Sequence, residues 1–94
     1  MPHISKTARY SIGNKIDSLF GEILESIFRA TYLPKKEKFP FLDKAIISLD
    51  VLKFFLQIAW EIKAIDNKKY VIISEPLNNI GKMLGGWKNQ VAKN

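Results

Sequence analysis

Basic side chains are the residues of this sequence best suited to bind a charged partner. Of the 94 residues, 15 are lysine or arginine and 9 are aspartate or glutamate, so the formal net charge is +6. The excess lies in two regions without any acid, residues 1–16 and 76–94, whose basic members are Lys6, Arg9, Lys15, Lys82, Lys88 and Lys93. Such regions favour a polyanion such as RNA or DNA, bound through its phosphates. Since most of these bases are lysine, and arginine is the usual reader of bases, a solvated lysine-rich surface is the alternative.

Residues suited to catalysis or metal binding are sparse. The single histidine, His3, has no carboxylate pair beside it, and the sequence contains no cysteine, which removes the usual zinc ligands. Glu22 and Glu25 share a helix face, but Glu25 lies four residues before Arg29 and fits an exposed ion pair. The glycines between residues 81 and 86 follow no predicted strand, as a phosphate-binding loop would require. We therefore expect a protein that is not an enzyme, with no catalytic residue, metal or cofactor.

Two long helices are predicted before residue 65, and they belong to an all-α fold. The first runs over about residues 11–32, with Ser11 as its N-cap, and ends at Leu33-Pro34. A charged connection and the break at Pro40 precede the second, over about residues 41–64. The second helix is apolar nearly all round, which is typical of a central helix that neighbours contact on several sides.

The third predicted helix has Asp66 as its N-cap and carries an uninterrupted heptad seam. The seam residues are Tyr70, Ile73, Leu77, Ile80, Leu84, Trp87 and Val91. Gly81, Gly85 and Gly86 lie beside the seam, although glycine in a helix costs roughly 0.5 to 1 kcal/mol relative to alanine. Either the helix stops at Leu84 with a glycine just beyond it, or another backbone packs closely against the glycines and Trp87 fills the neighbouring space. The continued period favours close packing.

Short connections predict an antiparallel up-down bundle, with residues 1–94 as one domain and residues 1–9 as a flexible tail. Hydrophobic residues make up 47% of the chain, more than a small three-helix monomer can readily cover. We therefore expect a homo-oligomer, with Phe54 and Ile58 on the helix that has too many apolar sides. No apolar stretch reaches the roughly 20 residues that cross a bilayer, and the absence of cysteine fits a reducing cytoplasm, so we expect a cytoplasmic protein without a membrane partner.

The predicted topology gathers bases at one end of the bundle. Lys35, Lys36 and Lys38 would lie there with Lys88 and Lys93. The candidate nucleic-acid-binding residues are Lys35, Lys36, Lys38, Lys82, Lys88, Arg9 and Lys15, and the candidate oligomer or packing residues are Gly81, Gly85, Trp87, Phe54 and Ile58. Phe39 and Phe41 alternate with the lysines, where they could stack on bases or, as is more usual beside a helix start, anchor the connection in the core.

Several segments resemble the accessory variability determinant (Avd) proteins of diversity-generating retroelements. The similar segments are Arg9 to Ile16, Leu49 to Ala59, Tyr70 with Ser74, and above all Ile80-Gly81-Lys82-Met83-Leu84-Gly85-Gly86-Trp87. They cover most of the chain in the family's order. Related families include small four-helix proteins encoded in intervening sequences of large ribosomal RNA genes.

The resemblance implies a four-helix bundle assembled into a homopentamer that binds nucleic acid and the retroelement reverse transcriptase. Such proteins support the mutagenic complementary DNA synthesis that diversifies a target gene, and they are not catalytic. The family has a further helix before the segment that matches Arg9 to Gly13, whereas only eight residues precede Arg9 here. The first family helix is therefore expected to be missing, which leaves other oligomers open. The alternative function is a purely structural helical interaction module, in which the lysines only aid solubility.

Overall fold

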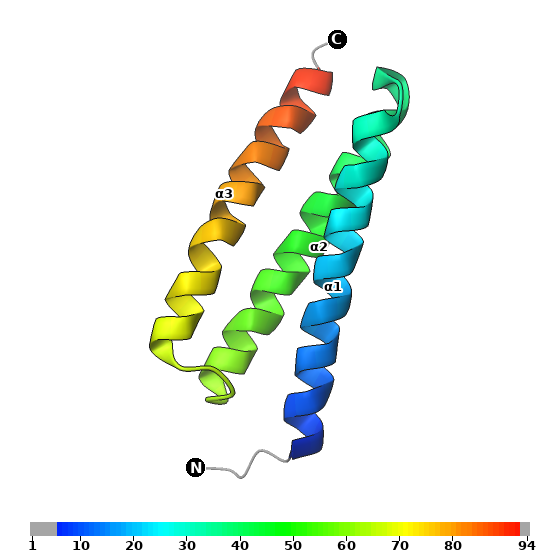
Figure 1. The fold of residues 1–94 in the computed structure, drawn as a ribbon. Coiled ribbons are helices and arrows are strands. Elements are labelled where there is room, and N and C mark those ends of the chain that lie inside the picture. The colour runs from blue at the N-terminus through cyan, green and yellow to red at the C-terminus, as the bar shows by residue number, and fades with distance from the viewer. Residues whose placement is uncertain (1–5, 93–94) are drawn as a thin grey trace.

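Three long helices make up the part of the chain that the structure describes. A computed structural model describes the backbone of residues 6–92 and the side chains from Tyr10 to Ala92. Helix α1 spans Lys6–Tyr32, α2 spans Lys35–Glu61 and α3 spans Asn67–Ala92. The chain rises along α1, returns along α2 and rises again along α3 (Figure 1). The result is an elongated body of 52 × 22 × 15 Å.

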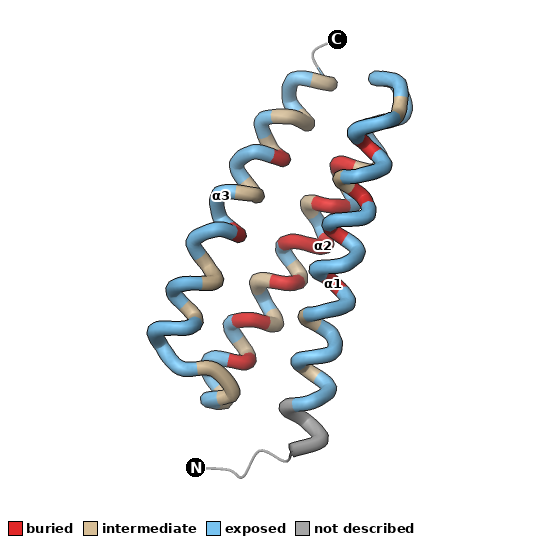
Figure 2. Tube along the Cα trace, in the orientation of Figure 1, coloured by how far each residue is buried: buried red, intermediate tan, exposed pale blue. Residues whose placement is uncertain are grey.

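Helix α2 occupies the centre with α1 and α3 packed on it, and within the described residues the backbones of α1 and α3 do not approach each other closely. Buried residues follow one another along α2, whereas α1 and α3 are exposed over most of their surface (Figure 2). The core consists mainly of leucines from all three helices, together with the small alanines that face them. The buried hydrophobic residues are Leu19, Ile23, Ala30, Leu42, Ala45, Leu49, Leu52, Leu56, Ala59, Leu77 and Leu84.

The starts predicted for the first two helices are both wrong. Helix α1 begins at Lys6 rather than Ser11, since residues 6–10 include good helix formers and no breaker. Helix α2 begins at Lys35, before the expected break at Pro40. Pro34 is its N-cap, and the Glu37 amide donates a hydrogen bond to the Pro34 carbonyl over 2.9 Å. Pro40 lacks an N–H group, so the helix passes through it at the cost of one hydrogen bond near its start.

The turn between α2 and α3 is closed by a Schellman motif. Helix α2 ends at Glu61, and Lys63 adopts a left-handed conformation with φ of 64°. The Ala64 amide donates to the Ala59 carbonyl over 2.8 Å, and the Lys63 amide donates to the Trp60 carbonyl over 3.0 Å. This motif ends α2 three residues before the predicted limit.

Helix α3 begins as the sequence predicts. The Asp66 carboxylate accepts a hydrogen bond from the Lys69 amide over 2.7 Å, which confirms its N-cap role. The helix continues through Gly85 and Gly86 to Ala92, so the alternative that it stops at Leu84 is wrong. Within the seam, Leu77 and Leu84 are fully buried, and the other five residues pack against the core while partly exposed.

Candidate nucleic-acid interface

The candidate interface is the basic end, defined here as Lys35, Lys36, Lys38 and Lys88 with their immediate contacts. Because α2 begins at Lys35, the first three of these lysines lie in its first turn and not in a loop. The amino terminus of a helix carries a partial positive charge, which adds to that of the lysines and favours an anion. Lys88 reaches the same end from the last part of α3, as its contact with Asp43 of α2 shows.

Lys38 joins all three helices. Its ammonium group donates to the carbonyl of Ala30 over 2.6 Å and contacts that of Thr31 over 3.4 Å, both in the last turn of α1. The same nitrogen lies 5.6 Å from the centre of the Trp87 ring on α3. These contacts satisfy carbonyls that have no partner at a helix end and place a cation against an aromatic face. The Lys38 charge therefore serves the fold as well as the surface potential.

Lys88 is also engaged inside the protein. Its ammonium forms a salt bridge of 2.7 Å with Asp43 and lies 5.1 Å from the centre of the Phe39 ring. Phe39 is exposed beneath this lysine, whereas Phe41 is partly buried against the core. Phe41 thus anchors the start of α2, and Phe39 offers a ring face that Lys88 already covers on one side.

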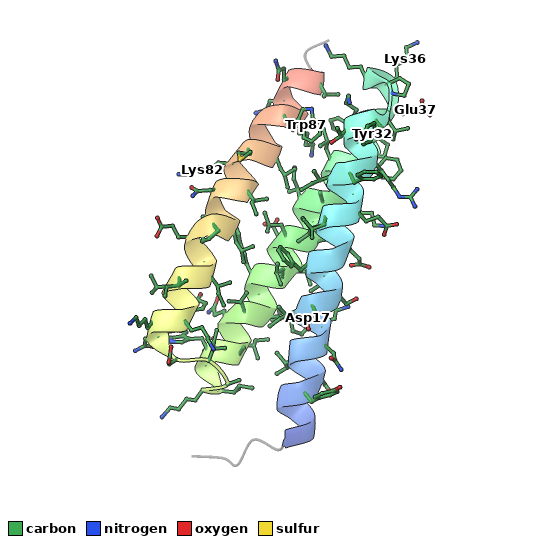
Figure 3. All side chains as sticks on the ribbon, in the orientation of Figure 1. Asp17, Tyr32, Lys36, Glu37, Lys82 and Trp87 are labelled. Carbon is green, nitrogen blue, oxygen red and sulfur yellow. The ribbon has the colours of Figure 1, made fainter. Side chains whose placement is uncertain are left out.

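Lys35 and Lys36 are the freely presented cations of the basic end. Both are exposed, and neither forms a hydrogen bond or ion pair within the described part of the chain. Figure 3 shows Lys36 extending from the end of the bundle, with the exposed acid Glu37 beside it. Trp87 points into the space between the helices at the same end, while Lys82 points away from the bundle.

Two further candidate bases, Lys15 and Lys82, do not join this end. Lys82 lies on the outer side of α3 (Figure 3). Lys15 is exposed in the first half of α1, which lies toward the end of the bundle opposite to the basic end (Figure 1). The side chain of Arg9 and the whole of Lys93 lie outside the described residues. Of the candidate bases whose side chains the structure describes, Lys35, Lys36, Lys38 and Lys88 lie at the basic end, while Lys15 and Lys82 lie elsewhere.

The candidate packing residues also differ in their surroundings: Gly81 lies in a close contact between helices, and Gly85 does not. A Cβ atom built on Gly81 would lie 3.3 Å from Leu49 Cδ2 and 3.4 Å from Lys53 Nζ, so α3 approaches α2 closely there, against side chains and not backbone. A Cβ atom on Gly85 meets nothing within 4 Å, so packing inside the chain does not explain that glycine. Trp87 and Ile58 are half-buried, and Phe54 is exposed.

Other functional groups are few over the described residues. Arg29 pairs with Glu25 over 3.1 Å on the exposed face of α1, as their spacing predicts. No group of three histidine, cysteine or acidic side chains comes together there as a metal site would require. In the same range no helix has both the length and the apolar character needed to cross a membrane.

An elongated helical bundle with one cationic end is the class that the fold and the charges define. Within that class the chain belongs to the bAvd-like family, whose model matches residues 1–91. Membership indicates an accessory protein of the retroelement type. Neither a curated protein nor a solved structure matches the chain.

Proposed function

We propose that this chain is a non-catalytic accessory protein of a diversity-generating retroelement. In this role it binds nucleic acid and the retroelement reverse transcriptase and supports mutagenic complementary DNA synthesis. The family match over residues 1–91 carries the proposal. The proposal includes self-association, with a homopentamer favoured by the resemblance to Avd proteins.

The basic end supplies the nucleic-acid contact in this proposal. Lys35 and Lys36 project their ammonium groups into solvent beside the positive terminus of α2, where phosphates would gain from both. Lys38 and Lys88 add positive potential, although Asp43 offsets part of it. Contacts of this kind bind many sequences, because lysine recognises the phosphate charge and not the base.

A second candidate function is a structural interaction module without a nucleic-acid role. The internal contacts of Lys38 and Lys88 favour it, since these two lysines have a structural use of their own. Under this alternative, Lys35 and Lys36 only keep the end of the bundle solvated. The two candidate functions differ in one expectation: only the first requires that RNA binding depends on lysines at the basic end.

The test compares two double variants with the same change of charge. Lys35→Glu with Lys36→Glu alters the basic end, while Lys68→Glu with Lys69→Glu alters the start of α3, at the opposite end of the bundle. Binding of single-stranded RNA is measured by fluorescence anisotropy over a salt series. Each lost phosphate contact should lower the salt slope by about 0.7, so the first variant should lose up to about 1.4 and the control much less.

Equal losses in the two variants would show a non-specific charge effect and favour the structural module. Co-purification with the reverse transcriptase of the same retroelement tests the protein contact separately. The proposal expects this association to survive Lys68→Glu with Lys69→Glu.

A further inference from the structure

A polar furrow lies between α2 and α3. Two cavities of about 350 Å³ and about 440 Å³ follow one another along these helices, and three lining residues belong to both. The shared residues are Asp50, Lys53 and Asn78, so the two cavities form one continuous furrow. Every described residue that lines it comes from α2 or α3, and the four lysines of the basic end are not among them.

Lys53 is the cation at the centre of the furrow. It is half-buried and faces Gly81 of α3, where its nitrogen is 3.4 Å from the place that a Cβ atom would take. Asp50 lies three residues earlier on the same helix, but no ion pair or hydrogen bond joins these two described side chains. A partly buried ammonium group without an acceptor gains from an anion beside it. Because residue 81 has no side chain, space for that anion is left beside the Lys53 nitrogen.

Neighbouring side chains add a second charge and further hydrogen-bonding groups. Lys82 is exposed at the end of the furrow nearer to the basic end. Ser74 and Asn78 follow each other at a step of four residues on α3, so they lie on one side of that helix. Within the described part of the chain, neither side chain forms a hydrogen bond. The furrow therefore presents polar groups that the fold does not use.

An aromatic ring lies in the other half of the furrow. Phe54 is 59% exposed and contacts Phe55 edge to face, with ring centres 5.7 Å apart and planes at 79°. Phe54 lines only the cavity of about 350 Å³, whereas Lys82 lines only that of about 440 Å³. The furrow thus has an aromatic half and a cationic half, with the three shared residues between them. An exposed ring of this kind can stack on a nucleobase.

We propose that the polar furrow binds a nucleotide. Lys53 and Lys82 bind the phosphate, Asp50 accepts hydrogen bonds from the sugar hydroxyls, and the Phe54 ring lies against the base. Asp50 sets the class of ligand, because a molecule that is anionic throughout, such as an acidic peptide, would be repelled by its carboxylate. A nucleotide carries its negative charge at the phosphate and offers hydroxyl donors beside it. Cavities of this size are typical of small-molecule sites.

This site goes beyond the proposed function, which places nucleic acid at the basic end and assigns no ligand to the furrow. The same chemical unit occurs as a free nucleotide and within an RNA strand. The variant Lys35→Glu with Lys36→Glu should bind nucleotide as the wild type does, whatever happens to its RNA binding. The two proposals therefore fail separately.

Equilibrium dialysis with radiolabelled adenosine 5′-monophosphate tests the furrow in the full chain. The wild type should bind this nucleotide saturably. Lys53→Met removes the charge at a similar side-chain length and should weaken binding about ten- to hundredfold, the usual effect of losing a hydrogen bond to a charged group. Lys44→Met is the matched control, because Lys44 is exposed on α2 outside the furrow, and it should bind as the wild type does. Circular dichroism checks that both variants keep their helices.

Asp50→Asn tests the class of ligand. Inorganic phosphate should displace the nucleotide, and the two affinities can be compared in the same dialysis. Loss of the carboxylate removes an acceptor for the sugar and also a repulsion toward phosphate, so the ratio of nucleotide affinity to phosphate affinity should fall about tenfold. An unchanged ratio would contradict the contact with the sugar and overturn the assignment of a nucleotide.

A short single-stranded oligoadenylate distinguishes the two sources. It is added to nucleotide-loaded Lys35→Glu with Lys36→Glu, so that the basic end contributes little. Displacement assigns the furrow to nucleotides of an RNA strand, while retention assigns it to the free nucleotide. No saturable nucleotide binding by the wild type would overturn the proposal, and so would equal losses in Lys53→Met and Lys44→Met.

Discussion

The contact of α2 with α1 and its contact with α3 differ in how deeply their residues are buried. On the side of α1, the buried residues include the small Ser26 and Ala30, and Ala45 of α2 is buried as well. Against α3, full burial is confined to Leu77 and Leu84. Small residues let helices approach closely, and close packing gains more dispersion energy for each turn. The α1 and α2 pair is therefore the firmer half of the molecule.

Polar and aromatic side-chain contacts add to the core packing of α3 at its two ends. Near the turn, the Trp60 ring stacks on Tyr70 with centres 5.0 Å apart and planes at 9°, and the Trp60 indole N–H donates to the Asn67 side chain. At the other end, Lys88 pairs with Asp43 and Lys38 lies against Trp87. Such contacts lie near solvent and contribute less than a buried seam. The comparison teaches that the basic end depends on the less firmly held helix.

The largest expected effect is a difference in unfolding free energy between substitutions in the α1–α2 contact and in the α2–α3 contact. Ile23→Ala removes a side chain that is 1% exposed in the α1–α2 contact and should cost about 3 to 5 kcal/mol of unfolding free energy. Leu77→Ala, on the α3 side of the core, should cost about 2 to 3 kcal/mol, because Leu77 lines an open apolar cavity between α1 and α3 and its surroundings can relax. Urea denaturation measures both. A larger loss for Leu77→Ala would reverse the ranking of the two contacts.

A smaller effect tests the closest approach between α3 and α2. Gly81→Leu places atoms where Leu49 and Lys53 already lie, and it should cost about 1 to 3 kcal/mol in thermal unfolding. Gly85→Ala is the control and should stabilise by about 0.5 to 1 kcal/mol, since its Cβ enters open space. A stabilised Gly81→Leu variant would mean that α3 moves away from α2 without penalty.

The smallest effect concerns the turn that ties α3 to the firmer pair. Lys63 holds a left-handed conformation that glycine adopts without strain, so Lys63→Gly should stabilise by about 1 kcal/mol. Lys63→Ala removes the same side chain while keeping the strain, and its melting temperature should stay near that of the wild type. Equal melting temperatures for the two variants would show that the turn stores no strain.

Periodicity predicted the three helices, and the family resemblance is confirmed by the match over residues 1–91. The heptad seam predicts α3 well because Leu77 and Leu84 are buried in the core and the other five seam residues pack against it. The helix starts were harder to predict. A proline often signals a break, but α2 continues through Pro40 and α3 through Pro76, each without the backbone hydrogen bond that a proline cannot donate.

The candidate site was predictable in outline and not in detail. A sequence can place Lys38 and Lys88 at the same end once the order of the helices is known. It does not show that Lys38 reaches the carbonyls of α1 or that Lys88 takes Asp43 as its partner, because these contacts depend on the rotation of each helix about its axis. The apolar cavity between α1 and α3 escaped prediction for the same reason, since it requires that the backbones of α1 and α3 stay apart.

That separation of α1 from α3 has a consequence for how the chain folds. Over the described residues, close backbone approach joins only helices that follow each other in the sequence, and the turns between them are short. Low contact order is typical of helical proteins that fold in microseconds to milliseconds. We expect the α1 and α2 hairpin to form while α3 is still being synthesised, and the last helix to dock on a surface that is already complete.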